Sequence, residues 1–91
     1  MLPKDSLLFQ NYPNPFNPVT KINYSLPRAV KVNINVYDII GRLVKTLVNE
    51  FKEAGSYDIQ FNGAGLASGV YFYILEADGM RIDSKKMVLV K

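Results

Sequence analysis

The 91-residue sequence contains no histidine, no cysteine and no tryptophan. These absences exclude metal sites built on imidazole or thiolate, iron–sulfur clusters, haem ligated by histidine, disulfide bridges, cysteine nucleophiles and serine–histidine triads. The longest apolar run, residues 70–75, is far shorter than the roughly 20 residues of a membrane-spanning helix. Most classes of enzyme therefore lack their usual side chains here.

The residues that are present suit one compact domain with a packed core. Hydrophobic residues make up 48% of the chain and aromatic residues 12%, which argues against a disordered chain. The net charge is +3, and the excess lies at the end of the sequence. Residues 81–91 carry four basic side chains against one acidic, whereas residues 1–80 carry seven of each. This pattern fits a solvated final strand or a basic recognition tag, and it fits nucleic acid less well because the patch is small.

Residues 10–18, QNYPNPFNP, contain three of the five prolines. Proline fixes φ and keeps the preceding residue out of the helical region, so this segment is expected to be extended and kinked. We expect Tyr12 and Phe16 to pack onto the domain, the alternative being an exposed stacking surface for sugar or peptide. The first five residues lack the basic-then-apolar layout of a signal peptide.

Alternating apolar residues predict strands at 19–26 and 30–37, each with one buried face. A further strand is expected around 57–61, and the chain then returns from 80 to 89. The stretch 69–77 is apolar on both faces and should be a central strand. Turn chemistry at Asp38 to Gly41 and at Asp78-Gly79 predicts hairpins, and Leu66 is the one large apolar residue of the loop 62–69.

The segment 39–53 supports two interpretations. Ile39, Leu43, Leu47 and Phe51 recur every four residues, which is typical of an amphipathic helix. The β context on both sides and the tight turn before it favour a return strand over 42–50.

Six or seven short strands at spacings near ten residues are best accommodated by two stacked antiparallel sheets, since a single sheet would leave one apolar face in water. The predicted fold is all-β, an immunoglobulin-like antiparallel β-sandwich of about seven short strands without a disulfide. Residues 1–18 are expected to be an extended Pro/Asn-rich lead-in packed on the domain, and residues 19–91 the sandwich.

No group of residues predicts catalysis. The acidic residues are spread singly along the chain, and no cleft is predicted to hold two carboxylates across a substrate. The glycine-containing loop 63–65 is followed by neither a helix nor the Lys-Ser/Thr of a phosphate-binding loop, and no string of calcium ligands is present. We therefore expect no enzyme, no cofactor and no metal site. In the last strand, lysines bracket an apolar run, as in an edge strand protected by charge or one offered to a receptor by β-augmentation.

Several short motifs resemble, in order and spacing, the type A C-terminal sorting domain of the type IX secretion system. The first lies in 10–18 and continues through Thr20 to Pro27. Others lie at 36–38 with 41–42, at 54–57, at 67–71 and at 86–91. The resemblance covers about residues 7–91. One departure is Phe61-Asn62-Gly63, where relatives often carry Trp-Asp-Gly; the aromatic residue and the turn former are kept.

The resemblance implies a non-catalytic export signal attached to the C-terminus of a cargo protein in Bacteroidetes and related bacteria. The cargo would cross the periplasm, and the folded domain would be recognised at the outer-membrane translocon, with the product secreted or held at the cell surface. A sortase-like peptidase would cleave near or before Leu7. One alternative is a structural accessory module of a multidomain extracellular protein, since the sandwich also resembles the immunoglobulin-like domain of the flagellar hook-capping protein. The other is a carbohydrate-binding module, which would require Tyr12, Phe16, Tyr71 and Tyr73 to face solvent in a row.

The site residues follow from this interpretation. The candidates for recognition by the translocon are Lys85, Lys86, Met87, Val88, Leu89, Val90 and Lys91. The motif residues expected to shape the frame are Asn11, Tyr12, Pro13, Asn14, Pro15, Phe16, Asn17, Pro18, Asp38, Gly41, Gly55, Tyr57, Gly69 and Tyr71. We expect neither nucleic acid nor a membrane span among the partners, and an unprotected edge strand could pair two copies of the chain.

Overall fold

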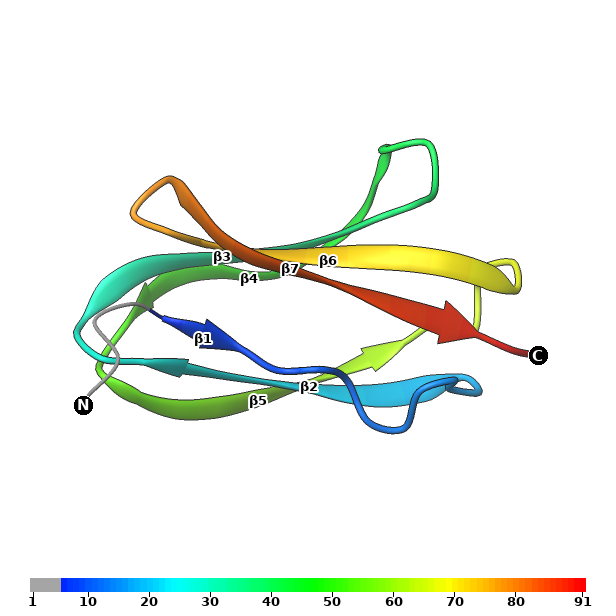
Figure 1. Ribbon diagram of the computed structural model, residues 1–91, viewed down its shortest axis with the longest axis horizontal. Helices are drawn as coiled ribbons and strands as arrows, with labels where there is room; N and C mark the ends of the chain where they lie inside the picture. The colour runs from blue at the N-terminus through cyan, green and yellow to red at the C-terminus, as the bar shows by residue number, and fades with distance from the viewer. Residues whose placement is uncertain (1–5) are drawn as a thin grey trace.

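The computed structural model describes residues 6–91, and over this range it is an all-β sandwich of two antiparallel sheets (Figure 1). The predicted fold class is confirmed. One sheet has the strand order β1-β2-β5 and the other β4-β3-β6-β7. The strands are β1 (Leu7–Leu8), β2 (Val19–Leu26), β3 (Val30–Tyr37), β4 (Leu43–Lys52), β5 (Gly55–Asn62), β6 (Gly69–Ala77) and β7 (Met80–Leu89).

The inner faces of β2 and β3 supply much of the core, as their alternating sequences predict. Every second residue of each strand is buried, because successive side chains of a strand point to opposite faces of its sheet. The residues of these two strands that are buried are Thr20, Ile22, Tyr24, Leu26, Val30, Val32, Ile34 and Val36.

β6 lies between β3 and β7, which confirms the central position expected from its two apolar faces. Tyr71, Tyr73 and Leu75 are buried between the sheets. The hydroxyl of Tyr73 donates a hydrogen bond of 2.8 Å to the carbonyl oxygen of Phe9, so the central strand is tied to the lead-in. Burial raises the pKa of Tyr73 to about 12.

The ambiguous segment 39–53 contains a strand, β4, which carries two β-bulges. Of the series Ile39, Leu43, Leu47 and Phe51, only Leu47 packs against the core and the other three are exposed, so the series does not form a buried helical face. The pairing of β3 with β4 skips Leu47 and then Val44, so each is an extra residue without a partner on β3. Each extra residue reverses the alternation of faces. Val44, Leu47 and Val48 consequently all pack against the core, a spacing that imitates one face of a helix.

Both predicted hairpin turns are present. The amide of Gly41 donates to the carbonyl oxygen of Asp38 at 3.0 Å, and Gly41 takes a φ of 87°, which suits glycine. Asp78 and Gly79 have φ values of 52° and 82°, and Ala77 pairs with Met80. Two positive φ values in a two-residue loop are the mark of a type I′ hairpin.

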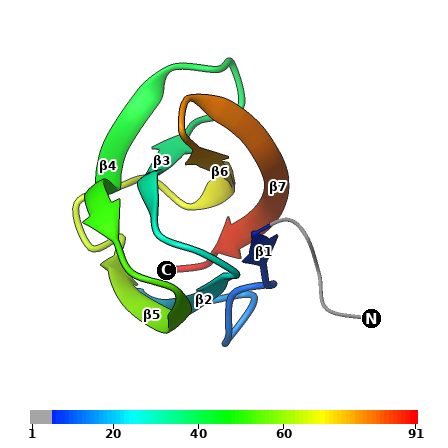
Figure 2. The same ribbon diagram turned by 90° about the vertical axis from the view of Figure 1, so that its left-hand side faces the viewer.

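The lead-in crosses from one sheet to the other along one side of the sandwich (Figure 2). It begins on the three-stranded sheet, where β1 pairs with β2 and Tyr12 forms a bridge with Lys21. It ends on the four-stranded sheet, where Phe16 forms a parallel bridge with Leu89 of β7. The peptide bonds before Pro13, Pro15 and Pro18 are cis. The first five residues of the expected lead-in lie outside the described part of the chain.

The two aromatic residues of the lead-in behave differently. Phe16 is buried, with 1% of its surface exposed, which confirms the expectation for this residue. Tyr12 is 82% exposed, so the expectation that it packs on the domain was wrong. The backbone of Tyr12 is held by two hydrogen bonds to Lys21, each of 3.0 Å, and this pairing turns its side chain outward.

Candidate functional site

The terminal segment 85–91, proposed from the sequence as the recognition segment, forms the end of β7 and the residues after it. Met87 and Leu89 are buried in the core. Lys86 on the same strand is exposed, and Val88 is half-buried. The segment is thus anchored by one face and presents the other at the surface of the domain.

The lead-in occupies the outer edge of this segment. The amide of Val88 donates to Oδ1 of Asn14 at 3.0 Å, and the carbonyl oxygen of Val88 accepts a hydrogen bond of 2.9 Å from the amide of Phe16. The amide of Val90 donates to the carbonyl oxygen of Phe16, also at 2.9 Å. β7 is therefore the last strand of its sheet, yet its edge is already paired from Val88 to Val90. A partner that adds a strand there must first displace the lead-in.

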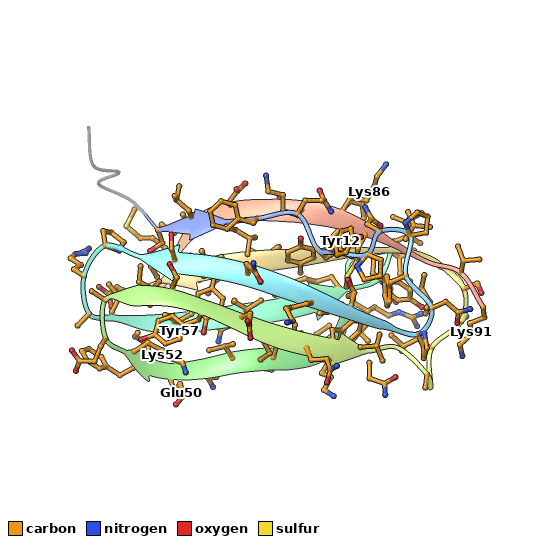
Figure 3. All side chains as sticks on the ribbon, turned by 90° about the horizontal axis from the view of Figure 1, so that it is seen from below. Tyr12, Glu50, Lys52, Tyr57, Lys86 and Lys91 are labelled. Atoms are coloured by element: carbon orange, nitrogen blue, oxygen red, sulfur yellow. The ribbon has the colours of Figure 1, made fainter. Side chains whose placement is uncertain are left out.

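The lysines of the segment differ in their surroundings (Figure 3). Lys85 Nζ lies 3.6 Å from a carboxylate oxygen of Asp83. Lys91 Nζ donates to the carbonyl oxygen of Ala64. Within residues 6–91, no carboxylate lies within 4.0 Å of Lys86 Nζ, and this side chain projects from the rim of the sandwich. Lys86 is thus the cation of the segment that is most available to a partner.

A buried hydrogen-bond network fixes the start of the lead-in. The side-chain amide of Asn11 donates to Thr20 Oγ1 at 2.9 Å and to the carbonyl oxygen of Pro13 at 3.1 Å. The Thr20 hydroxyl donates to the same carbonyl oxygen at 2.8 Å. Asn11 and Thr20 are both buried, so these bonds satisfy groups that would otherwise be costly to bury. The role of Asn11 is to hold the proline-rich segment on β2.

Phe16 locks the other end of the lead-in into the core. Its ring packs on Phe61 with a centroid separation of 5.9 Å. A Cβ atom on Gly63 would stand 3.3 Å from the Phe16 ring and 3.1 Å from Leu89, so glycine permits their close approach. Phe61 and Gly63 both belong to the Phe61-Asn62-Gly63 motif, so this motif receives the Phe16 ring at the edge of the core.

Two tyrosines make the same local bond. The hydroxyl of Tyr57 donates to the carbonyl oxygen of Glu53, and that of Tyr71 donates to the carbonyl oxygen of Ala67. Each bond measures 2.7 Å and reaches four residues back across a glycine, as in the tyrosine corners of immunoglobulin-like folds. The repeated Gly-x-Tyr pattern therefore fixes how β5 and β6 begin. Tyr57 also stacks on Tyr24, with 5.3 Å between ring centroids.

Asp38 shapes the β3–β4 hairpin. Its carboxylate accepts hydrogen bonds from the backbone amides of Arg42, at 2.9 Å, and Ile40, at 3.1 Å. Its other oxygen lies 2.8 Å from Nε of Arg42. The bond from the Arg42 backbone is the main cause that holds the pKa of Asp38 below its ordinary value. Asp38 and Gly41 thus define the turn.

The aromatic residues that could have formed a sugar-stacking surface do not line up at the surface. Phe16, Tyr71 and Tyr73 are buried, and only Tyr12 of these four is exposed. Within the described range, no cluster of three acidic, histidine or cysteine side chains could hold a metal ion, and no helix is long and apolar enough to span a membrane.

The structure brings the lead-in motif and the terminal segment together, although they lie near opposite ends of the sequence. Their meeting point is the bridge between Phe16 and Leu89. Sequence reasoning missed Gln10, whose side-chain amide donates to the carbonyl oxygen of Lys86 at 2.6 Å. It also missed the supporting roles of Thr20 and Gly63. No local pattern marks such residues, because their partners are distant in the sequence.

The structure as a whole is a β-sandwich domain whose last strand is anchored in the core and exposed along one face. A family model described as "Secretion system C-terminal sorting domain" matches residues 10–91. The chain therefore belongs to the family of C-terminal sorting domains of the type IX secretion system. Domains of this family are sorting signals and are generally non-catalytic; membership implies attachment to a cargo protein that is exported to the cell surface or secreted.

No curated protein matches the chain. A similarity to a solved structure bears on the fold alone. A solved structure of Pseudomonas fluorescens alkylpurine DNA glycosylase AlkC, bound to DNA containing an abasic site analog, is similar with a TM-score of 0.61 and 15% sequence identity. The similarity covers 93% of this chain and 30% of that one, so this chain corresponds to less than a third of the glycosylase's length.

Proposed function

We propose that this domain directs a cargo protein, attached at its N-terminal side, through the type IX translocon and across the outer membrane. The cargo reaches the translocon from the periplasm, and the folded domain is what the translocon recognises. The observation that carries the proposal is the arrangement of the terminal segment: Met87 and Leu89 hold it in the core while Lys86 stands at the surface. Such an arrangement suits a signal that is recognised in the folded state.

The remaining details follow the same proposal. The recognition residues are those of the segment 85–91, and the motif residues of the lead-in and of the turns maintain the frame that presents them. A sortase-like peptidase cuts upstream of the first strand, near or before Leu7. β1 begins at Leu7 and pairs with β2, so a cut before it leaves the described sandwich whole.

The direct test is a fusion of residues 1–91 behind a periplasmic reporter, expressed in a host with a working type IX system and in the same host without its translocon. We expect export in the first host and retention in the periplasm in the second. A reporter that stays in the periplasm of the competent host, while native cargo is exported, would contradict the proposal and favour the accessory-module alternative.

A variant of the terminal segment separates recognition from folding. Deleting residues 86–91 would remove Met87 and Leu89 from the core, so loss of export would not be informative. Replacing Val90 and Lys91 together by serine leaves both core residues in place. We expect reduced export with an unchanged circular dichroism spectrum, and the matched control is Lys45→Ser on the exposed part of β4.

A further inference from the structure

Tyr12 is an exposed aromatic side chain on a fixed backbone. Its amide and carbonyl both pair with Lys21 at 3.0 Å, and its neighbour Asn11 is buried and hydrogen-bonded. The side chain of Tyr12 is 82% exposed. An aromatic residue held in this way contributes a large contact area at low cost in conformational entropy, which is why tyrosine is frequent at the centres of protein interfaces.

Tyr12 lies in the part of the lead-in that runs along the edge of the terminal segment. The lead-in contacts β7 two residues before Tyr12, where Gln10 bonds to Lys86, and two residues after it, where Asn14 bonds to Val88. Tyr12 is therefore held opposite the stretch 86–88, and Figure 3 shows Tyr12 and Lys86 on the same rim. We call Tyr12, Lys86 and Lys21, the β2 residue that pairs with Tyr12, the junction surface.

The junction surface is positively charged. Lys86 has no carboxylate of the described residues within 4.0 Å. Lys21 lies 4.0 Å from Asp58, with about 60% of both side chains exposed, a distance and exposure at which the pair is weak and screened by solvent. A partner surface with carboxylates matches this charge, and Tyr12 supplies the apolar contact that a protein surface can cover.

We infer that the partner of this domain is an acidic protein surface that binds the side chains of the junction surface, and that the lead-in and β7 remain joined while it binds. The inference rests on the proposed function and names the chemistry of the recognition. Strand addition to β7 is the competing mode, and it requires the lead-in to leave, because the amides of Val88 and Val90 are already paired with it.

A disulfide lock distinguishes these two modes. Phe16 bridges Leu89, and Asn17 and Val90, the residues that follow each of them, are both exposed. The chain has no cysteine, so the pair Asn17→Cys and Val90→Cys can form only one disulfide within a molecule. After the disulfide has been verified by thiol alkylation of the purified protein, we expect the locked reporter fusion to be exported as well as the Val90→Cys single variant, which carries the same change in the terminal segment. Retention of the locked fusion alone would overturn the inference in favour of strand addition.

Charge and aromatic variants test the surface itself. We expect Lys86→Glu and Tyr12→Ala each to reduce export of the reporter about tenfold, since reversing an interfacial charge or truncating an aromatic contact commonly costs this much or more. Phe51→Ala and Lys45→Glu, both at exposed positions of β4, are the matched controls and should be exported normally. Circular dichroism should be unchanged in all four.

The outcomes separate this inference from the proposed function. Normal export of both Lys86→Glu and Tyr12→Ala would overturn the junction surface, while export of the unmodified fusion would still support a sorting signal. Retention of the unmodified fusion in the competent host would instead contradict the proposed function itself.

Discussion

Replacing Phe16 by alanine tests whether the lead-in is part of the folded domain. Phe16 is 1% exposed, packs on Phe61 and closes over Gly63 and Leu89. Truncating a buried phenylalanine to alanine costs about 3–5 kcal/mol, through lost burial and the cavity left behind. In a domain of this size each kcal/mol lowers Tm by about 4–8 °C, so we expect a fall of at least about 12 °C.

The measurement is thermal and urea unfolding of the 91-residue protein followed by circular dichroism. Tyr12→Ala is the matched control, because Tyr12 belongs to the same motif yet is exposed. Its effect should stay within about 0.5 kcal/mol, as for most surface substitutions. If Phe16→Ala unfolded at the same temperature as the unmodified protein, the lead-in could not be anchored in the core, and the argument for a sealed β7 edge would fail.

Three further predictions concern turns and buried hydroxyls, each measured by urea unfolding. The pKa of Asp38 in the folded protein lies below its ordinary 3.8, so the contribution of this carboxylate to folding stability is complete above pH 3.8 and is lost as pH falls through the folded pKa. The stability difference between the unmodified protein and Asp38→Asn should therefore shrink as pH falls below 3.8. A difference that stays constant with pH would contradict this. Gly41→Ala should lower the free energy of unfolding by about 1–2 kcal/mol, because alanine is strained at the φ of 87° that Gly41 adopts. Gly65→Ala, which also places its Cβ in open space, should be near neutral. Equal losses in the two variants would show that the positive φ of Gly41 is not what requires glycine there. Tyr73→Phe removes the hydrogen bond from the Tyr73 hydroxyl to Phe9 and should therefore lower the free energy of unfolding by about 1 kcal/mol at neutral pH. The pKa of Tyr73 is about 12 in the folded protein and 10.0 ordinarily, so as pH rises the tyrosine of the unfolded chain ionises first, and the unmodified protein loses stability between these two pH values. The phenylalanine variant has no such hydroxyl and should lose less stability over this range. An equally steep loss in both proteins would count against a buried hydroxyl at Tyr73.

Features of the fold that depend on neighbouring residues could be predicted from the sequence. The alternation in β2 and β3, the two apolar faces of β6 and the Asp78-Gly79 hairpin each arise from local rules of side-chain direction and backbone φ. β4 was ambiguous because Ile39, Leu43, Leu47 and Phe51 recur at a helical spacing, yet of these four only Leu47 packs against the core. Two β-bulges turn Val44, Leu47 and Val48 toward the core instead. A bulge depends on the partner strand, which the sequence of β4 alone does not show.

The candidate site was harder to predict because its contacts join distant segments. Tyr12 and Phe16 lie four residues apart in one proline-rich motif, and nothing local indicates that one is exposed and the other buried. The difference arises because Tyr12 pairs with β2 while Phe16 pairs with β7. The sequence indicated that some residues of the terminal strand pack in the core and others are exposed. It could not show that the edge of this strand is covered, because that depends on where the lead-in lies in space.

Amide hydrogen exchange at Val88 and Val90 tests the central claim most directly, namely that the lead-in and the terminal strand form one folded unit. These two amides donate to Asn14 and Phe16 of the lead-in. We predict that both are protected in the native protein, and that Phe16→Ala accelerates their exchange more than that of the β6 amides. Exchange of Val88 and Val90 at the rate of an unstructured chain would show an open edge and contradict the account.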